Sequence, residues 1–205
     1  KEPPPPFVPA GSPLGLVGSR INVNTGAWVD SSSHISGGID SYYEYLIKCA
    51  FLFSDTSFFR MWESSAAAAN ELLAQDTTTG YWYGVVNMYT GKREASYTGA
   101  LDAFYPAILT LSGDLERAKR LQESFYKMWT TFGIEPEGMD YAKMKVVYPG
   151  YPLRPEIIES AYYLYYFTRD DRYRQMGQVI FDSLKRYCRT EAGYASLKDV
   201  TTKEK

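Results

Sequence analysis

The sequence predicts a mostly α-helical domain made of repeated helical hairpins, with small β-hairpins on one face. The main observation is a recurring joint, where one aromatic-rich helix ends and an amphipathic helix begins, at Ser54, Ser112 and Thr168. These joints are 58 and 56 residues apart, and the residues flanking the first and third joints also match. The second observation is β-like sequence between the helix pairs. A repeat of this length is typical of stacked αα units, either an open solenoid or a closed toroid.

Composition excludes several classes of function. The 205 residues carry 22 basic and 24 acidic side chains, a formal net charge of −2, whereas nucleic-acid and anionic-membrane binders show a basic excess. Hydrophobic residues make up 45% and charged residues 22%, which is typical of a globular domain. Only one His is present, so a His-rich metal site is excluded and carboxylates are the main candidates for reactive groups.

The N-terminal region predicts an arm followed by a hairpin. Six of the 11 prolines lie within residues 1–13, which favours an extended arm, and residues 14–205 then form the main domain. Residues 20–29, with the turn Asn24-Thr25-Gly26, predict a β-hairpin. A Ser-rich loop then leads into a first helix over residues 39–53.

The helix pairs and their connections follow in order. The second helix is predicted from the first joint to about Leu73, and the Ser or Thr at each joint is predicted to cap the helix that follows it. Residues 81–87 and 92–97 flank a turn and predict a hairpin, and residues 141–151 predict another. Hairpins inserted at the same point of successive units would lie on one face, where such folds carry function.

An acid begins the first helix of each pair: Asp40, Asp102 and Glu156. If these helices are arranged side by side, the three carboxyl groups gather at one end of the bundle. An acid in a first turn also complements the helix dipole and caps free N–H groups. The two interpretations are about equally supported by the positions alone.

Two of these helices carry acid pairs. Asp40 and Glu44 are four residues apart, and Glu156 and Glu159 are three apart, so each pair shares a helix face. Arg154 precedes the second pair and is expected to hold one of its carboxyl groups ionised, with a lowered pKa. The chain contains 19 Tyr residues, many of them around these acids. Carboxylates among aromatic rings are typical of carbohydrate sites, although most of these rings are expected to pack in the core.

At this point the sequence resembles a known family, the class I α-1,2-mannosidases of glycoside hydrolase family 47. The most specific motifs are GGIDSYYEYLIK at residues 37–48 and LRPEIIES at residues 153–160. LDAF at residues 101–104 and GIEPE at residues 133–137 resemble family segments less specifically. Residues 15–18, the hairpin at 21–26 and Gly38 resemble the branch of ER-degradation-enhancing α-mannosidase-like proteins and their bacterial relatives.

The resemblance implies part of an (αα)7 toroid and an exo-α-1,2-mannosidase that trims high-mannose N-glycans with inversion. Matched by motif, Glu156 is the general base and Asp40 is a catalytic acid that delivers a proton. The substrate-binding residues implied in the same way are Glu159, Glu137, Arg154 and Asp102. Inversion requires the acid and base carboxyl groups to be about 6.5–9.5 Å apart.

The family uses a calcium ion, Ca²⁺, which prefers six to eight oxygen ligands. The resemblance places the direct ligands outside this chain, with Glu156 and Glu159 contacting calcium only through water. Three αα pairs are predicted against seven in the toroid, so we expect the chain to be a fragment that does not turn over substrate by itself.

Two other readings remain open. A degenerate toroid could bind mannose without cleaving it, in the manner of a lectin, and a helical-repeat scaffold could use the acids only as caps. Cys49 and Cys188 are expected to be buried free thiols, with a single bridge as the alternative. The implied partner is a high-mannose oligosaccharide or glycoprotein, not a nucleic acid, with an oxidoreductase as a further hypothesis for a eukaryote. The implied location is the secretory pathway and endoplasmic reticulum in a eukaryote, or export to the periplasm in a bacterium.

Overall fold

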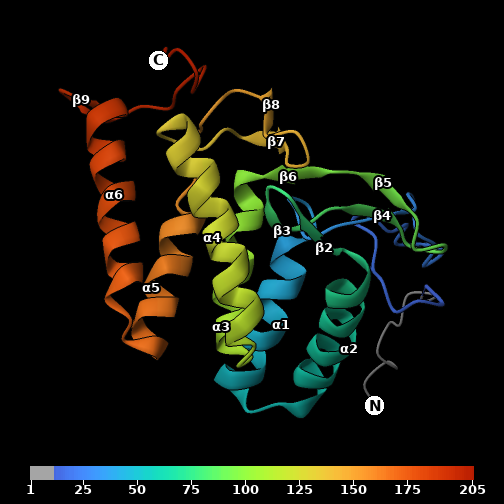
Figure 1. Ribbon diagram of the computed structural model, residues 1–205. Coiled ribbons are helices and arrows are strands. Elements are labelled where there is room, and N and C mark those ends of the chain that lie inside the picture. Colours follow the sequence, from blue (N-terminus) through green and yellow to red (C-terminus); the bar gives the residue numbers. More distant parts are fainter. Residues whose placement is uncertain (1–11) are drawn as a thin grey trace. The chain divides into compact units, whose positions relative to one another are not determined.

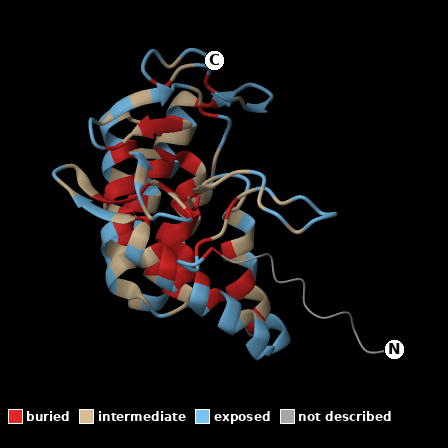
Figure 2. Ribbon diagram, turned by 90° about the vertical axis from the view of Figure 1, so that its right-hand side faces the viewer, coloured by how far each residue is buried: buried red, intermediate tan, exposed pale blue. Residues whose placement is uncertain are grey.

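The computed structural model describes residues 12–205, and these divide into two compact units (Figure 1). The first unit comprises residues 12–75 and 83–95, and the second comprises residues 76–82 and 96–205. The extended arm predicted for residues 1–13 falls almost entirely outside the described residues. In both units the buried positions lie mainly along the helices, and most turns are exposed (Figure 2).

The first unit contains one helical hairpin and a small sheet. Helices α1 (Asp40–Phe53) and α2 (Thr56–Leu72) pack against each other. The buried side chains of the two helices are mainly apolar, including Tyr43, Leu46, Ile47 and Ala50 of α1 and Trp62, Ala66 and Ala69 of α2. The antiparallel sheet has the order β1-β4-β5, with strands β1 (Ser32–Ser33), β4 (Val85–Asn87) and β5 (Arg93–Ala95).

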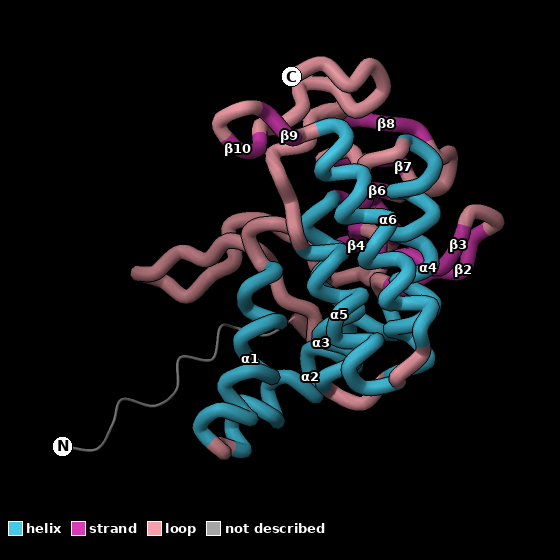
Figure 3. Tube along the Cα trace, turned by 90° about the vertical axis from the view of Figure 1, so that its left-hand side faces the viewer, coloured by secondary structure: helices cyan, strands magenta, loops and turns pink. Residues whose placement is uncertain are grey.

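The second unit contains two helical hairpins. Its helices are η1 (Ala100–Phe104, a 3₁₀ helix), α3 (Tyr105–Leu111), α4 (Leu115–Phe132), α5 (Glu156–Thr168) and α6 (Asp171–Tyr187). Helix α3 packs on both α4 and α5, and α5 packs on α6 (Figure 3). The three joints predicted from the sequence therefore all connect paired helices.

Short strands complete the fold. The second unit contains a sheet of order β6-β7-β8 and a β9-β10 pair, formed by β6 (Tyr97–Gly99), β7 (Gly138–Asp140), β8 (Lys145–Tyr148), β9 (Arg189–Thr190) and β10 (Gly193–Tyr194). Strands β2 (Ala74–Thr77) and β3 (Gly80–Tyr83) form a separate hairpin. No helix within residues 12–205 is both long enough and apolar enough to cross a membrane.

The capping residues differ from the prediction. The second helices of the pairs begin after Asp55, Asp114 and Asp170, whose side chains accept hydrogen bonds from backbone N–H groups at the helix starts. The Ser and Thr predicted as caps instead lie at the ends of the preceding helices. A carboxylate is favoured at this position because it also complements the positive end of the helix dipole.

The β-hairpins are confirmed in part. In the predicted hairpin at residues 20–29, Ile21 pairs with Trp28. The hairpin predicted for residues 81–97 is wrong in extent, because only β4 and β5 pair with each other, while β3 pairs with β2 and β6 with β7. The hairpin predicted for residues 141–151 begins three residues earlier, at Gly138.

Helix α5 is held in place by buried polar contacts at its first turns. The hydroxyl of Ser160 donates to the carbonyl of Ala103 at 2.5 Å and accepts from the N–H of Ala107 at 3.1 Å. The amide of Gln122, on α4, donates to the carbonyl of Ile157 at 3.3 Å. These bonds fix the start of α5 against η1, α3 and α4.

The segment before α5 is braced by residues that follow α6. Tyr151 and Leu197 exchange two backbone hydrogen bonds, of 2.8 and 2.9 Å, and the N–H of Val200 donates to the carbonyl of Pro149. On the other side, the N–H of Glu137 donates to the carbonyl of Gly150 at 2.7 Å. Residues 149–151 are therefore bonded on both sides.

The two cysteines are both free thiols. Cys188 is buried, as predicted, whereas Cys49 is only partly buried. The alternative of a single bridge between them is therefore wrong.

Candidate active site

The second unit gathers four acidic side chains near the start of α5. They are Asp102, Glu135, Glu137 and Glu156, called here the carboxylate cluster, and their charges are close enough to act on one another. The local backbone explains this. The pairing of β6 with β7 aligns Gly99 with Gly138, and the N–H of Ala100 donates to the carbonyl of Glu137 at 3.2 Å.

Arg154 forms a fork-shaped ion pair with Glu137. Its Nε lies 3.0 Å from Oε2 and its Nη2 lies 2.5 Å from Oε1 of the glutamate. The carbonyl of Arg154 also accepts the hydroxyl of Tyr151 at 2.7 Å. Bidentate pairs of this kind fix orientation as well as charge, so Arg154 and Glu137 are held in one geometry beside Glu156.

Glu156 is the first residue of α5 and is half-buried. Burial raises the pKa of its carboxyl group above 4.5, and this effect outweighs the lowering caused by the nearby Arg154. The predicted lowering of the pKa is therefore wrong for Glu156, because the sequence did not reveal how far the group is withdrawn from water. Glu159 lies one turn further along the same helix.

Asp102 is buried within η1, with 2% of its surface exposed. Its Oδ2 accepts hydrogen bonds from the hydroxyl of Thr98 at 3.0 Å and from the N–H of Gly99 at 3.2 Å. These contacts bind the carboxylate to Thr98 and Gly99, the residues that lead into the helical turn. Asp102 therefore caps a free N–H group at the start of a helix, as a first-turn acid can. It is also a member of the carboxylate cluster.

Asp40 belongs to the other unit, where it is the first residue of α1. Its Oδ1 accepts from the N–H of Ser41 at 2.9 Å. Glu44, one turn later, pairs with Lys48 at 2.5 Å. Asp40 is only partly buried, and the proton transfer that the sequence motif implies for it stays a prediction.

Glu135 is the acidic residue that sequence reasoning did not single out. It is fully buried, and burial raises the pKa of its carboxyl group well above 4.5, with further raising by Glu156, Glu137 and Asp102. The available signal was its position between Ile134 and Pro136, both of which are buried.

The raised pKa of Glu135 gives a prediction for stability. A group whose folded-state pKa is raised stabilises the fold below its unfolded pKa, and this contribution is lost as pH rises toward and through the folded value. The melting temperature of Glu135→Gln relative to the unchanged chain should therefore increase steadily from pH 4.5 upward. Thermal denaturation followed by circular dichroism measures this difference. The exposed Glu191→Gln is the control and should show no such trend.

A calcium ion does not fit the described residues as direct ligands. Within residues 12–205, no group of three or more His, Cys, Asp or Glu side chains is arranged to hold a metal. The expectation that Glu156 and Glu159 contact calcium only through water remains a proposal.

Gly138 makes room for two aromatic rings beside the carboxylate cluster. The rings of Tyr97 and Tyr148 meet edge to face, with centroids 6.2 Å apart, and a Cβ on Gly138 would lie 2.4 Å from Oη of Tyr97 and 2.8 Å from Cδ2 of Tyr148. Gly138→Ala is therefore expected to destabilise the chain by about 1–3 kcal/mol. Gly150→Ala, whose Cβ would meet nothing closer than 3.7 Å, is the matched control in urea unfolding. Equal midpoints for the two variants would contradict the prediction.

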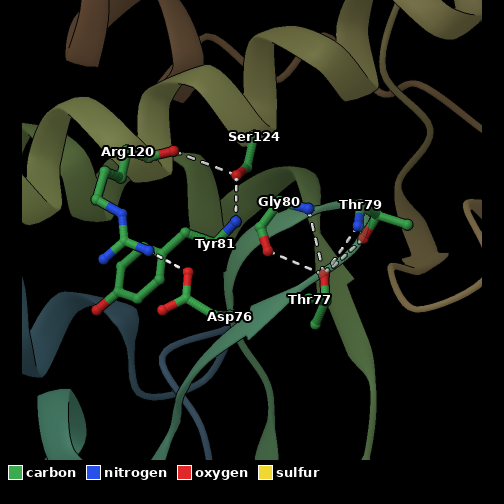
Figure 4. Close-up of polar contacts among 7 residues, drawn as sticks. All are labelled: Asp76, Thr77, Thr79, Gly80, Tyr81, Arg120 and Ser124. Atoms are coloured by element: carbon green, nitrogen blue, oxygen red, sulfur yellow. Dashed lines mark hydrogen bonds and ion pairs between the residues drawn. The ribbon is translucent and has the colours of Figure 1, made fainter.

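A second polar region lies where the β2-β3 hairpin meets α4, around a depression of about 460 Å³ (Figure 4). Arg120 pairs with Asp76 and lies over the ring of Tyr81, 4.2 Å from its centroid. The hydroxyl of Ser124 accepts the N–H of Tyr81 at 2.9 Å and donates to the carbonyl of Arg120. These groups bond to one another, which indicates that they hold the hairpin against the helix.

Comparisons with known proteins agree with this geometry. The model of glycosyl hydrolase family 47 matches residues 9–205. The chain is 37% identical to alpha-mannosidase I MNS5 of Arabidopsis thaliana over 193 residues, covering 93% of this chain and 33% of the relative. It is 37% identical to human ER degradation-enhancing alpha-mannosidase-like protein 2, covering 92% of this chain and 32% of the relative. The chain thus spans about a third of the length of these relatives.

The fold also matches a solved enzyme. The alpha-1,2-mannosidase from Trichoderma reesei superposes with a TM-score of 0.84 at 26% identity, over 95% of this chain and 47% of that chain. This likeness confirms the predicted fold class, αα-hairpins that form part of a toroid. Since the family model covers nearly the whole sequence, the chain belongs to glycosyl hydrolase family 47.

Proposed function

We propose that the whole protein to which this chain corresponds is an exo-α-1,2-mannosidase that trims high-mannose N-glycans with inversion. The observation that carries this proposal is the carboxylate cluster, in which Glu156 begins α5 beside the fixed Arg154–Glu137 pair. The cluster coincides with the LRPEIIES and GIEPE segments of the sequence. A scaffold whose acidic residues only cap helices would not require four acidic side chains to be gathered in one place.

In the proposed reaction, Glu156 acts as the general base. A water molecule attacks the anomeric carbon of the terminal mannose, and the carboxylate of Glu156 takes its proton as the glycosidic bond breaks. The pKa of Glu156 is raised toward the working pH by burial, and a base is most effective when its pKa lies near that pH. Asp40 is assigned the delivery of a proton to the leaving oxygen, either directly or through water.

Glu137, Glu159, Arg154 and Asp102 are proposed to bind the sugar. The fork between Arg154 and Glu137 leaves both side chains about 30% exposed, so their remaining polar atoms can meet hydroxyl groups. Asp102 also accepts hydrogen bonds from the hydroxyl of Thr98 and the N–H of Gly99, and these bonds fix the orientation of the carboxylate that is proposed to bind the sugar. Calcium belongs to the same proposal as a cofactor held by residues outside those described here.

The relatives support a proposal for the cellular location and partners of the whole protein. Proteins named for enhancing ER degradation are among those that match, in human, mouse and two yeasts. We therefore propose that a eukaryotic source places the whole protein in the secretory pathway, acting on glycoproteins, with an oxidoreductase as a further partner. For a bacterial source we propose export.

The test is the release of mannose from α-1,2-linked mannobiose by the whole protein, followed by proton NMR. We expect β-mannose to appear first, since inversion of an α-linkage gives the β-anomer, and we expect a calcium chelator to stop the release. Initial release of α-mannose would contradict the inverting mechanism. Binding of mannobiose without release would support the lectin-like alternative.

A further inference from the structure

The carboxyl group of Glu135 is the most unusual polar group in the described structure. The residue is 0% exposed, and neither of its carboxyl oxygens has a hydrogen-bond partner within residues 12–205. Oε2 of Glu156 is likewise buried and lacks a partner in this part of the chain. A buried polar group without a partner costs free energy, so two such groups in one cluster call for an explanation.

The surroundings of Glu135 favour a neutral acid. Its charged neighbours in the carboxylate cluster are Glu156 on α5, Glu137 before β7 and Asp102 on η1, and all three are acidic. Arg154, the cation that acts on Glu156, is already held by the fork to Glu137. A second or third negative charge in an enclosed space is unfavourable, and the buried member of such a set keeps its proton.

The other titratable groups nearby are also neutral. Burial raises the pKa of the Tyr151 hydroxyl well above its usual value, with Glu135 and Glu156 adding to the effect. That hydroxyl donates its proton to the carbonyl of Arg154 at 2.7 Å. Burial also raises the pKa of the Cys188 thiol, which lies near Tyr151. None of these groups supplies a positive charge that would allow Glu135 to ionise.

We propose that Glu135 is a positioning residue for Glu156: it remains a neutral carboxylic acid and offers its O–H, through one bridging water molecule, to the buried Oε2 of Glu156. A protonated acid is a donor in need of an acceptor, and Oε2 of Glu156 is an acceptor in need of a donor. Such a bond would stabilise the ionised form of Glu156 and fix one of its oxygens inward. The other oxygen is then left to act on water.

This inference rests on the proposed function in one respect only, the role of Glu156 as the general base. The location of the proton does not depend on catalysis, and it can be measured in the whole protein without substrate. The carboxyl ¹³C resonances of labelled glutamates report ionisation directly. Glu135→Gln and Glu156→Gln assign the two signals by their disappearance.

Two matched variants then test whether Glu135 acts as a hydrogen-bond donor or only fills space in the core. Glu135→Gln keeps the size and a donor, and we expect Glu156 to titrate as in the unchanged chain. Glu135→Leu keeps similar bulk but removes the donor, and we expect about a tenfold increase in the proton affinity of Glu156, the effect of one lost hydrogen bond. Identical titration of Glu156 in both variants would overturn the proposal.

A direct observation covers the case in which Glu135→Leu does not fold. In the unchanged chain at pH 7, the Glu135 signal is expected at the position of a protonated carboxyl group, and the position of an ionised one would overturn the proposal. The outcome of the mannose-release assay is independent of these titrations. Absence of hydrolysis together with the expected titrations would remove the proposed function and leave the Glu135–Glu156 coupling standing.

Discussion

Glu156→Gln is expected to lower kcat/KM for α-1,2-mannobiose by about 10²- to 10⁴-fold in the whole protein, the range usual for loss of a general base. The amide matches the carboxylate in size but cannot accept the proton of the attacking water. Binding of mannobiose should be largely kept, because the Arg154–Glu137 fork does not depend on Glu156. Steady-state kinetics and calorimetry measure the two effects.

The pH profile provides a second readout for this variant. Since the pKa of Glu156 is raised above 4.5, the acid limb of kcat/KM in the unchanged protein should fall above that pH, and the residual activity of Glu156→Gln should lack this limb. The exposed Glu191→Gln is the control and should keep both rate and profile. A Glu156→Gln rate within threefold of the unchanged protein would exclude Glu156 as the base.

Trp129→Ala is expected to destabilise the chain by about 3–5 kcal/mol, the range for removing a fully buried large aromatic side chain. Trp129 on α4 is 0% exposed, and its ring meets that of Tyr151 edge to face, with centroids 5.8 Å apart. Its Nε1 also donates to the hydroxyl of Ser183 on α6 at 3.2 Å. The substitution therefore leaves a cavity between two helices and the segment before α5.

Guanidinium unfolding of the 205-residue chain measures the loss. Trp129→Phe is the matched variant, since it keeps a ring against Tyr151 but gives up the bond to Ser183, and it should cost clearly less than Trp129→Ala. A loss below about 1 kcal/mol for Trp129→Ala would mean that the surrounding helices close the cavity without difficulty.

The helical part of the fold was predictable because it rests on local signals. The helices on either side of the joints near residues 54, 112 and 168 follow from apolar spacing and from polar residues at the joints. The identity of the caps was missed because Ser, Thr and Asp are all good capping residues and lie within two residues of one another at each joint. Which of them caps depends on where the preceding helix ends, and Ser54 adopts a left-handed conformation to end α1.

The strands were less predictable because their partners are distant in sequence. Residues 81–87 and 92–97 look like the two arms of one hairpin, yet β6 pairs with β7, about 40 residues further along. Alternation of polar and apolar residues marks a strand but does not identify its neighbour. Such pairings are set by the packing of the helices that separate the strands.

Within the candidate site, the sequence provided a set of candidate residues but not their environment. Glu156 and Arg154 were identified from a motif, whereas the balance between burial and the nearby cation decides the direction of the pKa shift of Glu156. Glu135 was overlooked because an acid between Ile134 and Pro136 has no periodic pattern to mark it. Its enclosure arises from tertiary packing alone.

The backbone bonds that join residues 149–151 to residues 197–200 have a consequence for the order of folding. Contacts between segments so far apart carry a loop-closure cost that local helical contacts do not, and they form slowly for that reason. Helices α5 and α6 can therefore pair before the segment carrying Tyr151 and Arg154 is clamped. We therefore expect the arrangement of this segment beside Glu156 to be completed late in folding.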